Sequence, residues 1–394
     1  MRFPEFSGEW KCTTIGNIGD IKNGPFGSVL HAEDYVENGI PIVTTEHFKT
    51  GLMPSDKFGI PQVSNEDYIR LKGYRLETND IVFSRVGSVD INAHVGIEQN
   101  GWLFSGRVLR VRPKYDIDSL FLHYALSTEA VKRDIRNRAV GQTMPSINTP
   151  ILSSTTIQLP KDLFEQKKVA HFLRLLDERI ITQNKIIEKL QSLIKGLIDD
   201  IITLKCGQLV AFETLYSKAG EGGTPTTSNT EFYDNGSIPF IKIDDLSNKY
   251  LSANKDYITE LGLKKSSAWL IPTHSIIYSN GATIGAISIN KYPVCTKQGI
   301  LGIVPNTNID VEFLYYFMQS SYFQKEVERV VTEGTMKTAY LKDINHIKCP
   351  IPDLDRQKEI SHLLSVLSLK EDVERQLLQK YQIQKQYLLR KMFI

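Results

Sequence analysis

The sequence of 394 residues is written twice, and this duplication constrains the fold more than any other feature. Residues 35–43 return as residues 233–241, and residues 80–84 return as residues 275–279. Three further blocks recur in the same order, at a nearly constant offset of about half the chain: residues 121–124 and 313–316, 143–144 and 335–336, and 159–167 and 351–358. An internal repeat of this length predicts two copies of one structural unit.

Each copy has the same internal order. Short apolar and β-branched runs, broken by Gly, Asn, Asp and Pro, are typical of strands and turns; examples are residues 39–45, 80–84 and 238–243. A helical pattern follows in each copy, and a short β-like segment then ends at Pro160 or Pro352. The sequence therefore predicts two β-rich domains.

A long helix follows the first domain. No proline occurs from Asp162 to Leu204, and apolar residues recur with heptad spacing in two series offset by three, with only Gln183 polar. Asp162 and Glu165 have the spacing of a capping box, and the helix would be about 60 Å long at 1.5 Å per residue. The residues predicted to pack between helices are Leu173, Leu176, Ile180, Ile187, Leu190, Ile194, Leu197 and Ile201.

A second helix is predicted from Asp353 to the C-terminus, with a less regular seam. Leu364, Leu367, Leu378 and Leu388 fit heptad spacing, but Glu371, Glu374 and Lys385 fall on the same seam. A kink, a register shift or an asymmetric partner would each explain those charges. Neither apolar stripe is wide enough for a separate globular domain, so we expect the two helices to form an intramolecular antiparallel coiled coil.

The predicted fold class is therefore α+β, with two tandem β-rich domains joined and separated by two long helices in a pseudo-twofold arrangement. The expected boundaries are 1–160 for the first domain, 161–206 for the central helix, 207–352 for the second domain and 353–394 for the C-terminal helix.

The residues that would carry chemistry are not grouped into any familiar constellation. The sequence has no GxxxxGK[ST] phosphate loop and no HExxH pair, and its four cysteines are scattered, so we predict no catalytic centre and no metal site. No apolar run reaches the roughly 18 residues that a membrane helix needs, and we expect a cytoplasmic protein without membrane contact. The net charge of +2 means that any nucleic-acid binding must come from local clusters of Lys and Arg.

With this organisation in view, the chain resembles the specificity (S) subunit, HsdS, of type I restriction–modification systems over essentially its whole length. The resemblance is carried by the duplication, the junction at residues 159–177 and the heptads that follow it. The second junction, residues 351–364, departs in having Arg356 where the first has Glu165. Residues 222–226 and 281–285 also look like pieces of target-recognition domains.

The resemblance implies a DNA-binding subunit that is not itself an enzyme. Each domain would read one half of a bipartite, non-palindromic site in double-stranded DNA, and the helices would set the spacer between the half-sites. Two methyltransferase (M) subunits would dock on the helices, bind S-adenosylmethionine and methylate adenine N6, and restriction (R) subunits would use ATP and Mg. No cofactor is expected on this chain. The competing hypotheses are a coiled-coil scaffold with two β-rich ligand-binding modules and no affinity for DNA, an enzyme with an unrecognised centre, and an orphan specificity subunit that only exchanges recognition domains.

The residues expected to touch DNA are basic side chains for phosphates and polar side chains on loops for base edges. In the first domain they are Lys22, Arg85, Lys132, Arg133, Arg136, Arg138, Gln142, Thr143 and Ser146. In the second they are Lys218, Thr224, Lys242, Asn280, Lys297, Gln298, Thr335 and Lys337.

Overall fold

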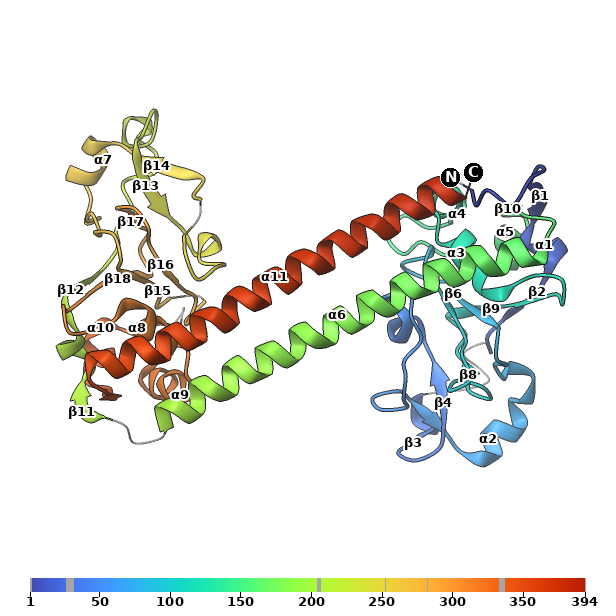
Figure 1. Cartoon of the computed structure of the whole chain (residues 1–394), viewed down its shortest axis with the longest axis horizontal. Coiled ribbons are helices and arrows are strands. Elements are labelled where there is room, and N and C mark those ends of the chain that lie inside the picture. The colour runs from blue at the N-terminus through green and yellow to red at the C-terminus, as the bar shows by residue number, and fades with distance from the viewer. Residues whose placement is uncertain are drawn as a thin grey trace. The chain divides into compact units, whose positions relative to one another are not determined.

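The computed structural model describes residues 2–25, 32–203, 207–251, 253–281, 283–332 and 337–393. The chain divides into two compact units, Met1–Gln183 with Leu377–Ile394, and Asn184–Gln376. Each unit contains one β-rich domain and a segment of each of two long helices, α6 (Leu163–Thr203) and α11 (Leu354–Met392) (Figure 1). The division into units therefore cuts through both helices, whereas the boundaries expected from the sequence lie at the helix ends.

The two domains share the topology of a four-stranded main sheet but differ in a second sheet, whose order is β3-β5-β4-β8 in the first unit and β14-β13-β17 in the second. A four-stranded antiparallel sheet has the order β2-β9-β6-β7 in the first unit and β12-β18-β15-β16 in the second. A second sheet of short strands contains the only parallel pairs among the described strands, β4 with β8 and β13 with β17. A two-stranded ribbon, β1-β10 or β11-β19, precedes each long helix along the chain.

The strand bounds in the first unit are β1 (Lys11–Thr14), β2 (Gly19–Asn23), β3 (Tyr35–Val36), β4 (Ile40–Val43), β5 (Gln62–Val63), β6 (Ile81–Ser84), β7 (Asn92–His94), β8 (Leu103–Phe104), β9 (Val108–Pro113) and β10 (Thr156–Leu159). Those in the second are β11 (Gln208–Ala211), β12 (Tyr216–Glu221), β13 (Ile238–Ile241), β14 (Asp256–Ile258), β15 (Ile276–Ser279), β16 (Ile287–Ile289), β17 (Cys295–Thr296), β18 (Ile300–Pro305) and β19 (Lys348–Ile351).

The strand β6 is buried on both faces, which explains its continuous apolar run. Successive side chains of a strand point to opposite faces of the sheet. Ile81 and Phe83 accordingly pack in the core under the helices, and Val82 packs in a second core with the short-stranded sheet. The strand β15 divides its side chains between two cores in the same way.

Three short helices follow the main sheet along the chain in both units, α3 (Ser119–Leu126), α4 (Glu129–Arg138) and α5 (Thr149–Ser153) in the first and α8 (Val311–Phe317), α9 (Ser321–Val330) and α10 (Leu341–Ile344) in the second. The first of each three begins at an aspartate N-cap, Asp118 or Asp310, whose side chain accepts a hydrogen bond from a backbone N–H in the first turn. The other short α-helices are α1 (Ile15–Ile18), α2 (Asn65–Arg70) and α7 (Glu260–Lys264).

The repeated glutamine at each junction joins the long helix to its domain. The Gln166 side chain accepts from the backbone N–H of Asp118 at 2.9 Å and donates to the Pro160 carbonyl at 3.0 Å. The Gln357 side chain makes the same two bonds in the second unit, to Asp310 at 2.9 Å and to Pro352 at 2.8 Å. The repeated proline and glutamine are therefore structural.

The long helices pair along the predicted seam. In the first unit Leu173 and Leu176, near the start of α6, share a core with Leu388 and Met392 near the end of α11. In the second unit the end of α6 shares a core with the start of α11 through Ile194, Ile198, Ile360 and Leu364. The pairing is therefore antiparallel, as expected. Of the other seam residues, Ile187 is buried, Ile180, Leu190, Leu197, Leu367 and Leu378 are half-buried, and the Ile201 side chain and Leu204 lie outside the described residues.

Two details of the predicted helices need correction. The predicted capping box at the start of α6 does not form. The Asp162 side chain accepts a hydrogen bond from the backbone N–H of Phe164. The Glu165 carboxylate instead forms an ion pair with Arg2 at 2.7 Å and accepts a hydrogen bond from the Trp10 indole N–H at 3.1 Å. The irregular seam of α11 involves no break, since the helix is continuous, and Lys385 on that seam pairs with Asp177 of α6. Among the described residues, no helix is both long and apolar enough to cross a bilayer.

Candidate nucleic-acid interface

Four backbone hydrogen bonds gather the loops at one end of the sheets in the first unit. They run from Gly24 to Val108, from Ser105 to Val43, from Arg85 to Arg107 and from Ile147 to Arg85, at 2.9 to 3.0 Å between N and O. They join residues 24–25, 44–46, 85–88, 105–107 and 140–147, which we call the first loop cluster.

The second unit repeats these four bonds position for position. They run from Gly222 to Ile300, from Lys297 to Ile241, from Asn280 to Gly299 and from Ala339 to Asn280, at 2.9 to 3.1 Å. The residues that they join, 222–226, 242–245, 280–281, 297–299 and 337–339, form the second loop cluster. The two clusters are built by main-chain groups in corresponding turns of the repeat.

The loops approach so closely that glycine is required at one position of each cluster. A Cβ on Gly24 would collide with the carbonyl oxygen of Ser105, and a Cβ on Gly222 would collide with that of Thr296. Residues 222–226, which the sequence singled out, are therefore a place of close backbone approach at Gly222.

The first loop cluster brings several of the predicted DNA-binding residues together. Arg85 lines a cavity of about 450 Å³, and its guanidinium donates to the Gly106 carbonyl at 3.0 Å. The segment 140–146 lies against the Arg85 loop through the bridge between Val86 and Ser146. At its tip Gln142 and Thr143 are exposed. Arg85, Gln142, Thr143 and Ser146 therefore lie in one loop cluster.

Of the basic residues of α4, Arg133 and Arg136 are exposed, and Lys132 and Arg138 are half-buried. Arg136 forms ion pairs with Asp90, at 2.5 Å, and with Glu129. Arg138 donates to the Ile151 carbonyl at 3.0 Å and to the Ser154 hydroxyl at 2.8 Å, and so holds the end of α4 to α5. These two side chains are already engaged within the domain. Lys132 lines a different cavity beside α6 and α11, and Arg133 is exposed.

Each copy also carries a predicted lysine over an aromatic ring. The amine of Lys22 lies 5.1 Å from the centre of the Tyr74 ring, and that of Lys218 lies 4.2 Å from Trp269. The two lysines occupy β2 and β12, which are equivalent strands of the repeat. A cation–π contact positions the amine and leaves its charge in place.

In the second loop cluster the predicted residues have different surroundings. Lys297 and Gln298 are exposed, and the Thr224 hydroxyl accepts a long hydrogen bond of 3.5 Å from the backbone of Gln298. Lys242 pairs with Asp256 at 2.8 Å. Asn280 is 1% exposed and its amide donates to the Ala339 carbonyl at 3.2 Å, so it holds the cluster and does not face solvent. Lys337 is exposed, and Thr335 lies outside the described residues.

Arg107 belongs to the site but is absent from the prediction. It lines the same cavity as Arg85, is exposed, and forms no ion pair within the described part of the chain. Burial and Asp34 raise the pKa of the Tyr35 hydroxyl in this cavity, while the charge of Arg107 lowers it. An alignment of the repeat would have indicated this loop, because Ser105 and Gly106 match the predicted residues Lys297 and Gln298, but it would not have indicated the arginine, which matches Gly299.

Comparisons with known proteins identify the family of the two domains. The family model of the type I restriction modification DNA specificity domain matches residues 7–192 and again residues 216–381. The MjaX protein of Methanocaldococcus jannaschii, a suggested type I restriction enzyme specificity subunit, is 28% identical over 97% of this chain and 91% of its own length. The EcoR124I/EcoR124II specificity subunit of Escherichia coli is 30% identical over 42% of each chain.

A solved structure shares the fold over the whole chain. The S subunit of a type I restriction-modification system from M. genitalium is similar with a TM-score of 0.61 at 16% identity, covering 100% of this chain and 99% of that one. Because the two matches of the family model account for most of its length, the chain belongs to the family of type I restriction modification DNA specificity domains and carries two copies of that domain.

Proposed function

We propose that this chain is the DNA-recognition subunit of a type I restriction–modification complex, in which each domain reads one half of a bipartite site. The observation that carries the proposal is the pair of matched loop clusters, one in each family domain, each presenting basic and polar side chains. Basic groups suit phosphates, and Gln, Thr and Arg suit base edges. The scaffold hypothesis is not favoured, because the matching family model describes DNA specificity domains.

The reaction chemistry would reside on partner subunits. Two methyltransferase subunits would bind S-adenosylmethionine and methylate adenine, restriction subunits would use ATP and Mg, and this chain would supply no catalytic group. Docking of partners on the helices is supported by exposed apolar side chains on α11, where Leu363, Val366, Leu369 and Val373 are 46 to 65% exposed. Apolar side chains exposed together on one helix are typical of protein interfaces.

The first experiment maps methylated adenines in the DNA of cells that express this chain with its methyltransferase partner. We expect a split motif, with two specified halves around an unspecified spacer. A contiguous palindrome traced to this subunit, or failure of the purified complex to bind any duplex, would overturn the proposal.

A second experiment tests the loop clusters themselves. Arg107→Ala and Lys297→Ala should each weaken DNA binding and reduce the slope of log K against log salt by about 0.9 for each phosphate that the variant no longer neutralises. The control is Lys370→Ala on α11, where the lysine side chain is 61% exposed and pairs with Glu374 four residues along the helix. Slopes equal to that of the control would exclude both loop clusters as binding sites for phosphate.

A further inference from the structure

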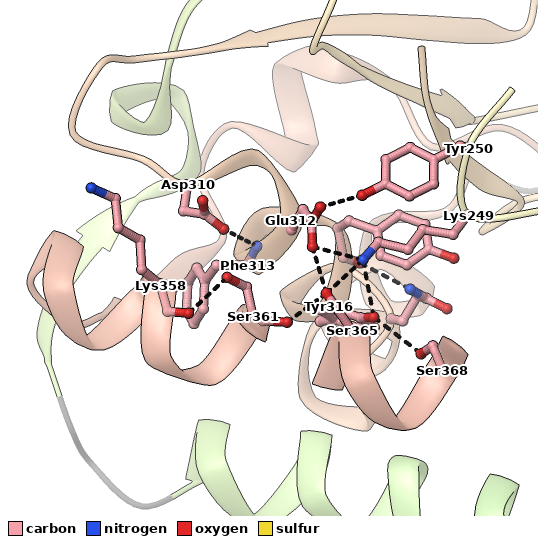
Figure 2. Close-up of polar contacts among 12 residues, drawn as sticks. Lys249, Tyr250, Asp310, Glu312, Phe313, Tyr316, Lys358, Ser361, Ser365 and Ser368 are labelled. Atoms are coloured by element: carbon pink, nitrogen blue, oxygen red, sulfur yellow. Dashed lines mark hydrogen bonds and ion pairs between the residues drawn. The ribbon is translucent and has the colours of Figure 1, made fainter. Parts of the chain in front are cut away.

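A partly buried lysine network links the second domain to one spacer helix. Lys249 lies in the loop between β13 and β14, and its amine contacts the Glu312 carboxylate of α8 at 2.8 Å and the Ser365 hydroxyl of α11 at 2.7 Å (Figure 2). It also lies 3.2 Å from the Tyr316 hydroxyl. One amine therefore joins three separate elements of the second unit.

The network shields most of the lysine side chain from water, and less of the glutamate side chain. The Lys249 side chain is 15% exposed and that of Glu312 is 29% exposed. Tyr250 and Ser365 both donate hydrogen bonds to Glu312, and the Tyr316 hydroxyl bonds to that of Ser368 at 3.1 Å. A charge-assisted hydrogen bond that is shielded from water is stronger and more directional than a surface ion pair.

The loop that carries Lys249 is part of the layer that supports the second loop cluster. The backbone of Lys249 accepts from Ile289 at 2.7 Å, and Leu251 donates to Ile289 at 3.0 Å. Leu251 packs in one core with Ile241 and Ile300, whose carbonyls hold Lys297 and Gly222 of that cluster. The network therefore connects the proposed DNA-reading layer of this unit to α11.

In the first unit, the tyrosine equivalent to Tyr316 takes part in a different ion-pair network. Tyr124, which matches Tyr316, donates to Asp177 of α6 at 2.7 Å, and Asp177 pairs with Lys385 of α11 at 2.5 Å. When the repeats are aligned on the helix N-caps Asp118 and Asp310, Glu312 is equivalent to Leu120. When they are aligned on the buried residues Phe48 and Leu246, Lys249 is equivalent to Gly51. The Asp177–Lys385 ion pair therefore joins the two long helices, whereas the Lys249–Glu312 ion pair lies within the second domain and is joined to α11 by the hydrogen bonds of Ser365.

We propose that Lys249, with Glu312 and Ser365, is a positioning residue that fixes the orientation of the second recognition domain on α11. Because orientation determines where this domain meets its half-site, Lys249 thereby sets how strictly the protein distinguishes one spacer length from another. This inference rests on the proposed function in DNA recognition. Lys249 itself is not proposed to touch DNA.

The test compares Lys249→Met with the wild-type chain, each in complex with its methyltransferase partner. Binding is measured on duplexes whose spacer is the native length, one base pair shorter or one longer. We expect discrimination between native and altered spacers to fall about tenfold, the low end of what a charge-assisted hydrogen bond contributes. Lys249→Arg should restore part of the discrimination, and the surface control Lys370→Met should leave it unchanged.

Hydrogen exchange of the DNA-free complex provides a readout that is independent of DNA recognition. Lys249→Met should raise exchange in residues 246–251 and at the start of α11, while Lys370→Met should not.

If exchange rises but spacer discrimination matches the wild type, the positioning role is wrong. If hydrogen exchange in Lys249→Met is also unchanged, the network does not hold the second domain to α11. If Lys249→Met fails to fold, Ser365→Ala takes its place with the same expectations. If the wild type binds no duplex, the proposed function fails, and the exchange result still decides whether the network holds the domain.

Discussion

Replacing Lys385 with methionine tests how much one ion pair contributes to the pairing of the long helices. The Lys385 amine lies 2.5 Å from Asp177, and the side chains are 25% and 11% exposed. The Tyr124 hydroxyl donates to the other carboxylate oxygen at 2.7 Å, and both burial and this carboxylate raise the pKa of Tyr124. The variant would keep the carboxylate and its tyrosine partner but remove the opposing charge.

The expected loss follows from that exposure. Removing one partner of a fully buried pair costs about 3–5 kcal/mol because the remaining charge stays uncompensated. Lys385 is a quarter exposed, so water can compensate part of the charge, and we expect about 2–3 kcal/mol. For a unit of this size that lowers the melting temperature by about 5–10 °C.

The assay is thermal unfolding followed by calorimetry, with each unfolding transition treated separately because two units need not unfold together. Lys49→Met is the matched control, since its ion pair with Glu46 lies in the same unit, is exposed on both sides (59% and 66%) and contributes at most about 1 kcal/mol. Adding Asp177→Asn to Lys385→Met should recover at least about 1 kcal/mol, because the amide removes the charge and still accepts from Tyr124. A destabilisation no larger than in the control, or a double variant no milder than the single one, would refute the reasoning.

Two further predictions concern residues of the first domain. Burial, followed by the nearby charges of His94 and Lys385, lowers the pKa of His123 to about 3, while unfolded histidine titrates near 6.5. The unfolded state therefore binds the extra proton between these values, and stability falls as pH falls, by up to about 1.4 kcal/mol per pH unit. His123→Gln should reduce that slope in urea unfolding at pH 7, 6 and 5, and equal slopes would contradict the assignment. Arg138→Ala should lower the unfolding free energy by about 1–3 kcal/mol because it removes internal hydrogen bonds, and it should leave the salt dependence of DNA binding unchanged; a reduced salt slope would instead support the DNA contact predicted from the sequence.

The sequence predicted the parts of this fold that repeat or have a regular period. Duplicated blocks indicated two domains, and heptads indicated two paired helices. Both patterns can be recognised within one sequence, the first by comparing its halves and the second by the spacing of neighbouring apolar residues. The charges on the second seam were ambiguous for the opposite reason. Lys385 is compensated by Asp177, more than two hundred residues away in sequence, and no periodicity connects the two.

The candidate site was predicted less completely, for a similar physical reason. Residue type separates basic from acidic side chains but does not show which basic ones are already paired. Arg136 and Arg138 have the composition of a DNA-binding helix, yet their partners lie within the fold. Asn280 resembled a base-reading amide and is a buried connector. Arg107 was missed because a single arginine in a loop has no pattern of its own.

The main-chain origin of the loop clusters has a consequence for how such a protein can change. Hydrogen bonds between backbone groups exist whatever side chain a residue carries, provided that the few glycines at close approaches remain. Most side chains at the tips of these loops are therefore not needed for folding. A domain of this construction can exchange them, and with them the sequence it prefers, without rebuilding the framework that presents them. Substitutions at the loop tips can then change the DNA sequence that the domain prefers while leaving its folding stability nearly the same.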